Sequence, residues 1–214
     1  MSKQAGKGQA HDDGEMERKL SQIFHLTRRK IGSFQPRQLS LTIHGIAKIA
    51  SVVKEVGNIR DGNCVEAAFH SLLLDDTVHH ELFDTVANHI VMLESLTGFS
   101  SQSLVNIAWA FAKVELPQPE LFSKFAEHIA SLQRLDGFNS QALSNTVWAF
   151  ATTGVYHEAL FDKVARHIVS LQSLDEFEPQ HISNTLWAFA NAPNIPFHEP
   201  LFDKISDFIV ANNS

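Results

Sequence analysis

The sequence predicts an all-α protein, an α-solenoid of tandem two-helix repeats of about 39 residues, and three observations support this fold class. Residues 99–137 and 138–176 align without gaps over 39 residues with 20 identities. A Leu-Phe pair marks the period, with its leucines at positions 82, 121, 160 and 201. Gly (10) and Pro (7) make up about 8% of the 214 residues, against roughly 12% in an average protein, so turn-rich β folds are disfavoured.

Further copies flank these two units. A third copy begins at Phe177, and the first half of a unit starts at Leu82. A divergent copy at residues 34–49 matches the second helix of the other units but replaces its Gln, Asn and Trp. The replacing residues are Arg37, Leu41 and His44. A single unit cannot bury its apolar face alone, so stacked neighbours are expected to share one continuous core.

Each unit is expected to hold two helices. The first carries apolar residues at helical spacing, as at Leu82, Val86 and Ile90. The second follows an N-capping residue, and its L-x-N-x-x-W-A-F-A body is almost wholly apolar, so neighbouring repeats must cover it. The expected N-caps are Gln35, Ser100, Asn139 and Glu178. The predicted helices span residues 15–30, 36–54, 63–74, 80–95, 101–113, 119–133, 140–152, 158–173, 179–191 and 199–211.

The chain divides into three parts. Residues 1–14 are expected to form a disordered N-terminal tail. Residues 15–78 hold the divergent basic helical hairpin plus an inserted helix, and residues 79–214 hold the tandem helical repeats. The repeat units start near Leu82, Leu121, Leu160 and Leu201.

Several classes of protein are disfavoured. The single cysteine, Cys64, can form neither an intramolecular disulfide nor a cysteine-based zinc site. No apolar run approaches the roughly 20 residues that span a bilayer, and no transit peptide is visible at the acidic N-terminus. No phosphate loop, G-x-S-x-G or H-E-x-x-H motif occurs. We therefore expect no enzyme, no cofactor, no metal and no membrane partner.

Opposite charges on two parts of the chain give the main functional indication. Residues 18–60 carry a net charge of +8, whereas residues 82–214 carry a net charge of −8. A basic segment is typical of a protein that contacts the phosphates of a polyanion such as RNA. The alternative is a solvated face, in part beside a helix C-terminus. The candidate phosphate-binding residues are Arg28, Arg29, Lys30, Arg37, Lys48 and Lys54.

Two residue types recur within the second helices. Asparagine, a poor helix former, occupies one mid-helix position as Asn106, Asn145 and Asn184. We interpret these amides as a ladder, each bonded to a neighbouring helix end, with base recognition as the alternative. Tryptophan recurs as Trp109, Trp148 and Trp187. These rings could stack bases, but the small residues around them favour a place in the core.

Other positions differ from one repeat to the next, although the residues around them are the same. The base-contacting positions of proteins that bind one RNA base per repeat vary in this way. Drift of ordinary surface residues is the alternative. The base-reading candidates are Asn88, Glu127, Arg166, Lys124, Lys163 and His181. Histidines also recur at positions 89, 128 and 167. Adjacent repeats lie about 10 Å apart, too far to share a metal ion, so we expect these histidines to be structural.

The segments L-S-N-T-V-W-A-F-A (143–151) and I-S-N-T-L-W-A-F-A (182–190) resemble the octotricopeptide repeat of algal organelle proteins. The same pattern occurs in FAST-kinase-like and RAP-domain proteins and in helical-repeat subunits of the kinetoplastid RNA-editing substrate-binding complex. The resemblance covers residues 82–214 well and residues 34–49 weakly. It implies an RNA-binding solenoid of the mitochondrial or chloroplast matrix; otherwise the expected location is cytoplasmic.

Together these features predict a non-catalytic RNA-binding helical-repeat protein of organellar RNA processing, editing, stability or translation. Its expected partners are single-stranded RNA and other proteins of a ribonucleoprotein complex. The alternative is an armadillo- or HEAT-like scaffold for protein–protein interactions, which would use the concave surface of the solenoid. Basic residues that converge on one concave face would favour RNA binding, whereas a mixed or apolar groove would favour the scaffold.

Overall fold

The computed structural model describes residues 18, 19, 22–56 and 76–212, and within these residues every regular element is a helix. Residues 22–30 form a helix that the short turn η1 (Ile31–Ser33) joins to α2 (Pro36–Val56). The predicted tail at residues 1–14, the predicted helix at 63–74 and the cysteine at position 64 lie outside the described residues. The all-α prediction is confirmed.

The tandem repeats follow as alternating helices whose starts agree with the predicted ones, except that the first starts at Asp76 and not at residue 80. They are α4 (Asp76–Val91), α5 (Ser101–Lys113), α6 (Pro119–Ser131), α7 (Ser140–Thr153), α8 (Glu158–Ser170), α9 (Pro179–Ala190) and α10 (Glu199–Asn212). The predicted ends at 95, 133 and 173 are too late. Leu132 and Leu171 adopt extended backbone angles directly after α6 and α8, so the leucine-rich tails belong to turns and not to helices.

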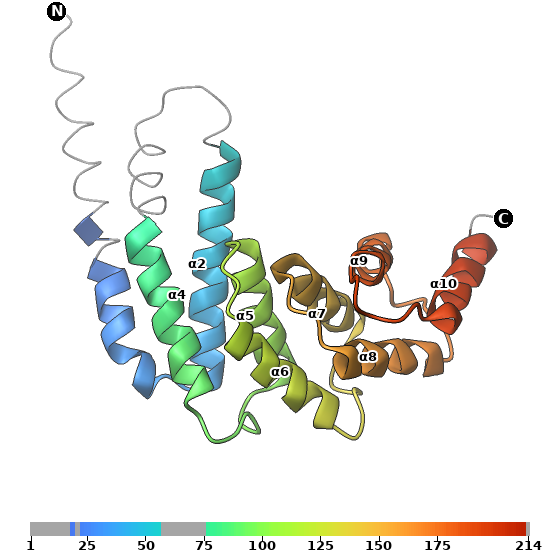
Figure 1. Cartoon of the computed structure of the whole chain (residues 1–214). Helices are drawn as coiled ribbons and strands as arrows, with labels where there is room; N and C mark the ends of the chain where they lie inside the picture. Colours follow the sequence, from blue (N-terminus) through green and yellow to red (C-terminus); the bar gives the residue numbers. More distant parts are fainter. Residues whose placement is uncertain (1–17, 20–21, 57–75, 213–214) are drawn as a thin grey trace, which may run out of the picture.

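The helices form two layers that run the length of the molecule (Figure 1). We call α4, α6, α8 and α10 the A helices, and α2, α5, α7 and α9 the B helices. Each B helix packs closely along the next one, whereas successive A helices contact each other over fewer residues. Small residues such as Ala110 and Ala149 are fully buried in the B layer and permit the close approach. The A helices therefore follow the outer path of the curve (Figure 1).

Phenylalanines join the two layers. In each complete repeat, the Phe of the Leu-Phe pair meets the Phe of W-A-F-A edge to face. The ring centroids lie 4.9 Å apart for Phe83 and Phe111, 4.9 Å for Phe122 and Phe150, and 5.2 Å for Phe161 and Phe189. This geometry is one that aromatic pairs prefer, and the three pairs use six of the 16 phenylalanines of the chain.

Polar side chains at the starts of the B helices cap these helices and connect successive repeats. Ser100 Oγ and Asn139 Oδ1 accept the backbone N–H groups of Ser103 and Ala142, as the sequence predicts. Ser140 Oγ donates to the carbonyl of Glu176 at 2.7 Å, one repeat further on.

The divergent copy occupies the corresponding place in the stack. Ser101 Oγ bonds to the carbonyl of Gly137, and a side chain added at Gly98 would meet Pro36, the residue of α2 equivalent to Ser101. The segment that contains α2 is therefore a B helix in register with the others.

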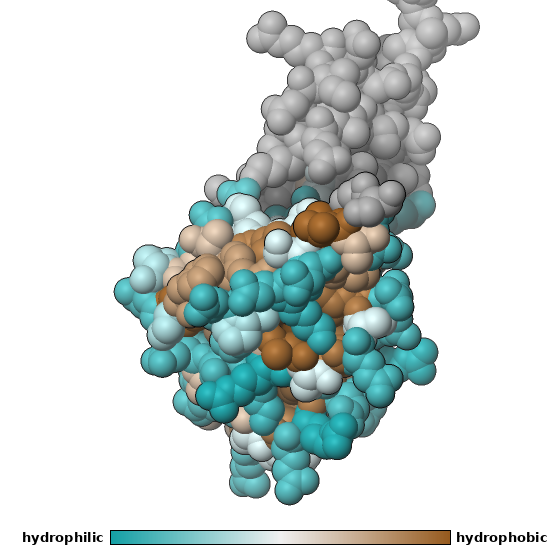
Figure 2. Space-filling view, turned by 90° about the vertical axis from the view of Figure 1, so that its right-hand side faces the viewer, coloured by the Kyte–Doolittle hydropathy of each residue, from teal (hydrophilic) through white to brown (hydrophobic). Residues whose placement is uncertain are grey.

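The end of the solenoid formed by α9 and α10 exposes several large apolar side chains among polar ones. Figure 2 shows this end, where hydrophobic side chains gather between hydrophilic ones. Phe197 in the loop between these helices is 72% exposed, and its ring lies 4.7 Å from that of Phe202. No helix in the described part of the chain is both long enough and apolar enough to cross a membrane.

Candidate nucleic-acid interface

One stripe of each B helix stays uncovered, and together the four stripes form a surface that we call the B face. Its residues recur at steps of four, three and four, which keeps them on one side of a helix. All of them are exposed or half-buried. The B face comprises Arg37, Leu41, His44 and Lys48; Gln102, Asn106, Trp109 and Lys113; Gln141, Asn145, Trp148 and Thr152; and Gln180, Asn184, Trp187 and Asn191.

Charge is divided between the two layers. The helices α5, α7 and α9 contain no Asp or Glu, whereas α6, α8 and α10 contain both acids and bases. The acids of those A helices are Glu120, Glu127, Glu158, Asp162, Glu199, Asp203 and Asp207. The negative charge of the repeats thus lies on the A helices and the connecting loops. The B face carries three cations, Arg37, Lys48 and Lys113, and no acid.

A groove of about 520 Å³ opens on the B face between α2 and α5. Arg37, Leu41, Gln102 and Asn106 are among the residues that line it. Within the groove, Gln102 Nε2 donates a hydrogen bond of 2.7 Å to Asn106 Oδ1. The groove therefore combines a guanidinium group with two amides whose mutual orientation is set by a hydrogen bond.

His44 occupies the tryptophan position of the divergent repeat and lies against the next repeat. Its ring centroid is 4.7 Å from that of Trp109, with an angle of 44° between the ring planes. Burial and the charge of Lys48 lower the pKa of His44, against an opposing effect of the Asn106 backbone. The imidazole is consequently neutral at pH 7 and continues the row of aromatic rings.

The prediction that the tryptophans are core residues is wrong in part. Trp109 and Trp148 pack against the core but are only half-buried, and Trp187 is 43% exposed. The physical reason is that the B layer has A helices on one side only. Its other side faces solvent, and the tryptophans stand on that side.

The predicted ladder of asparagines is also wrong. Asn106 bonds to a side chain of its own helix, and in the described part of the chain neither the Asn145 nor the Asn184 amide has a hydrogen-bond partner. Among the side-chain nitrogen and oxygen atoms of the described residues, His44 Nδ1 alone is both buried and without a hydrogen-bond partner. The amide atoms of Asn145 and Asn184 therefore reach solvent.

The candidate phosphate-binding residues fall in two places. Arg37 and Lys48 lie exposed on the B face. Arg28, Arg29 and Lys30 lie exposed at the end of the helix formed by residues 22–30, where Arg28 forms an ion pair with Glu81 of α4. The side chain of the lysine at position 54 lies outside the described residues.

Two of the base-reading candidates, Lys124 and Lys163, bond to the preceding repeat and form part of a lysine ladder that sequence reasoning missed. Lys124 Nζ donates to the carbonyls of Val91 (2.6 Å) and Leu93, at the end of the preceding A helix. Lys163 makes the same contacts with Ala130 (3.1 Å) and Leu132. Lys204 repeats them once more, with Val169 (2.8 Å) and Leu171. The recurrence of an identical lysine in three units was the available signal, since surface drift would not preserve it.

The remaining base-reading candidates do not meet in one site. Asn88, Glu127 and Arg166 are exposed on three successive A helices. His181 is buried at the start of α9, where its Nδ1 accepts the backbone N–H of Glu178 at 3.2 Å. The His181 ring thus caps its own helix.

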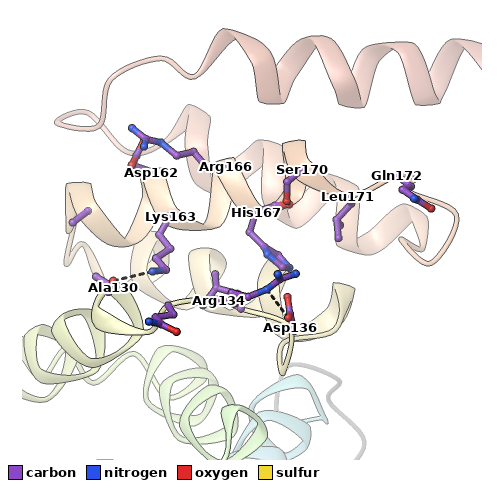
Figure 3. Close-up of a pocket in the computed structure, with 13 residues that line it drawn as sticks. Ala130, Arg134, Asp136, Asp162, Lys163, Arg166, His167, Ser170, Leu171 and Gln172 are labelled. Carbon is purple, nitrogen blue, oxygen red and sulfur yellow. Dashed lines mark hydrogen bonds and ion pairs between the residues drawn. The ribbon is translucent and has the colours of Figure 1, made fainter.

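A larger groove of about 900 Å³ lies between α6 and α8 on the A side (Figure 3). Each cation in it has a partner. Lys163 reaches the carbonyl of Ala130, Arg134 pairs with Asp136 at 2.7 Å, and Arg166 pairs with Asp162 at 2.9 Å (Figure 3). The mixed charge makes this groove a poorer site for a polyanion than the acid-free B face.

The recurring histidines lie near the ends of the A helices. Burial lowers the pKa of His128 and of His167, and at His167 the neighbours Asp136 and Arg134 act in opposite directions. No group of three His, Cys, Asp or Glu side chains in the described segments is arranged to hold a metal ion.

Comparison with known proteins adds one finding. A family model described as the RNA-editing substrate-binding complex 6 protein matches residues 56–211, nearly three quarters of the chain. The matched stretch includes α5, α7 and α9 with their part of the B face. A search of curated proteins finds no match.

Proposed function

The chain belongs to the family of the RNA-editing substrate-binding complex 6 protein, and from this premise we propose that it is a non-catalytic subunit that binds single-stranded RNA within such a complex. The observation that carries the proposal is the division of charge between the layers. Lys and Arg contacts with phosphates supply much of the affinity for nucleic acids. The B face offers such contacts, and none of its residues is acidic.

Arg37 and Lys48 are the proposed centre of the phosphate contacts. Both stand on α2, at the N-terminal end of the B face, and Arg37 lines the groove between α2 and α5. The exposed residues Arg29 and Lys30 extend the basic surface toward the preceding helix. Arg28 contributes less, because Glu81 neutralises it. The family supports a role in RNA editing and, with it, a mitochondrial location over a chloroplast one.

The salt dependence of RNA binding tests this proposal. Each phosphate neutralised on a single strand contributes about −0.7 to the slope of log K against log salt. Arg37→Ala/Lys48→Ala is expected to weaken the binding of every RNA sequence and to flatten that slope by about 1.4. Fluorescence anisotropy of labelled single-stranded RNA between about 50 and 200 mM salt provides the measurement.

A matched control removes two cations from the A side. Arg134→Ala/Arg166→Ala changes the net charge by the same amount, but both residues are paired with acids outside the B face. We expect this variant to bind RNA as the wild type does. Equal losses in both variants would indicate a non-specific charge effect, and no binding by the wild type at about 50 mM salt would reject the proposed function.

A scaffold for proteins is the second candidate function, and the exposed apolar side chains at the end formed by α9 and α10 favour it (Figure 2). Exposed large apolar residues are unusual on a monomer when they gather in one place. A chain that binds no RNA but is retained by other subunits of the complex, with Phe197→Ser abolishing the retention, would support this second function over the first.

A further inference from the structure

We propose that the B face binds the bases of single-stranded RNA as well as its phosphates, at one base per repeat. In this arrangement the tryptophans stack on the bases, and the asparagine amides form hydrogen bonds with the base edges. The inference rests on the proposed function and assigns the binding site to particular side chains.

The aromatic row is the first observation. The chain contains three tryptophans, and all three lie on the B face at the same position of successive repeats. His44 adds a fourth ring, in contact with Trp109. A large ring that remains partly exposed in every repeat provides a stacking surface, and stacking tolerates any base because every base has a π-face.

The amide row is the second observation. Asn145 and Asn184 present a donor and an acceptor to solvent, without a partner among the described residues. In Asn106 the Oδ1 atom accepts from Gln102, which leaves the Nδ2 donor available. An amide pairs well with the donor and acceptor groups of a base edge, and unstacked bases of single-stranded RNA expose those edges.

The two rows are close enough to act on one base. Each Asn precedes the Trp of its helix by three residues, so the two side chains are neighbours on the helix surface. Packed helices lie about 8–10 Å apart, and other helical-repeat proteins bind one RNA base per repeat. Bound bases would therefore follow the B helices in order, from the basic end at α2 toward α9.

Because the same residues recur in each repeat, successive RNA bases are expected to meet similar surroundings. Three identical Asn and Trp pairs provide three similar environments for bases. The B face is thus expected to favour a run of one base over a mixed sequence. An acidic protein partner is also attracted to cations, but it offers no planar bases to stack on the three tryptophan rings.

Intrinsic fluorescence tests the aromatic part directly, because every tryptophan of the chain lies on the B face. Short oligonucleotides of each single base and one mixed sequence are titrated into the full chain. Inorganic polyphosphate, which has charge but no bases, is the comparison ligand. We expect RNA to quench tryptophan emission at saturation and polyphosphate to leave it unchanged.

Matched variants test the individual residues. Asn145→Ala/Asn184→Ala is expected to weaken the binding of the preferred homopolymer about tenfold and to leave polyphosphate binding unchanged. Its control, Asn194→Ala/Asn212→Ala, removes two exposed asparagines elsewhere and should bind as the wild type does. Trp187→Leu is expected to cost at least about fivefold, whereas Phe197→Leu, at another exposed aromatic, costs nothing.

Different results would contradict the base contacts and RNA binding itself. Salt-dependent RNA binding with unchanged tryptophan emission and unaltered affinity of the asparagine variant would overturn the inference while the proposed function stood. A parallel loss of RNA and polyphosphate binding in the asparagine variant would also overturn it. Absence of any RNA binding by the wild type would reject the proposed function itself.

Discussion

Trp148 and Phe150 stand two residues apart in α7 and lie in different surroundings. The Phe150 side chain is fully buried and meets Phe122 of α6 edge to face. The Trp148 side chain points to the other side of the helix, on the B face, and remains half-buried. Burial of apolar area determines most of what an aromatic contributes to folding, and solvent reaches part of the Trp148 ring but none of the Phe150 ring.

Alanine substitutions should show this difference. Phe150→Ala is expected to lower the free energy of unfolding by about 3–5 kcal/mol, because it leaves a cavity between the two layers. Trp148→Ala should cost less, about 1–2 kcal/mol, because solvent already reaches part of the ring. Urea denaturation followed by circular dichroism measures both values. A loss for Trp148→Ala that equals or exceeds that of Phe150→Ala would contradict the placement of this ring.

At the scale of the elements, the lysine ladder of Lys124, Lys163 and Lys204 connects each A helix to the one before it. The last carbonyls of a helix have no partner within the helix and carry partial negative charge. Each ammonium group donates to one carbonyl in the last turn of the preceding A helix and to a second carbonyl in the turn that follows it. These lysines thus stabilise the outer layer, where direct contacts between helices are fewer.

Lys163→Met tests the ladder, since methionine keeps much of the apolar stem but removes the ammonium group. The change is expected to destabilise the fold by about 1–2 kcal/mol, through loss of charge-assisted hydrogen bonds to the end of α6. Lys48→Met, at an exposed position of α2, should stay within about 0.5 kcal/mol of the wild type. If thermal or urea unfolding shows equal effects for the two variants, the ladder does not stabilise the fold.

At the scale of the whole molecule, packing of the A layer links stability to pH. Burial lowers the pKa of His128 in α6 and of His167 in α8 below the usual value of 6.5. The folded chain therefore binds fewer protons at these sites than the unfolded chain does. Their contribution to stability is fully present above about pH 6.5 and is lost as the pH falls through the lowered values.

The melting temperature is accordingly expected to decrease as the pH falls from about 7 to 5. His128→Gln/His167→Gln removes both titrating groups and should make this decrease shallower. Calorimetry of the wild type and the variant across this pH range provides the comparison. A variant whose melting temperature falls as steeply as that of the wild type would show that other groups govern the dependence.

The sequence by itself determined the repeats, the helices and most of the N-caps. These features are local or periodic: the 39-residue spacing, the polar residue before each B helix and the apolar steps of each A helix need no knowledge of the partner elements. It also indicated the basic segment and the recurring Asn and Trp positions. It assigned the Asn and Trp positions to the interior of the protein.

Only the tertiary structure decided which side of each B helix remains uncovered. A helix that is apolar nearly all round has no polar face to indicate the solvent side, so the exposure of Trp187 and Asn184 could not be derived from their neighbours in sequence. The partners of Lys124 and Lys163 likewise belong to the preceding repeat. Stacking also gathers the acid-free helices α5, α7 and α9 in one layer, whereas the acids of α6, α8 and α10 lie in the other layer.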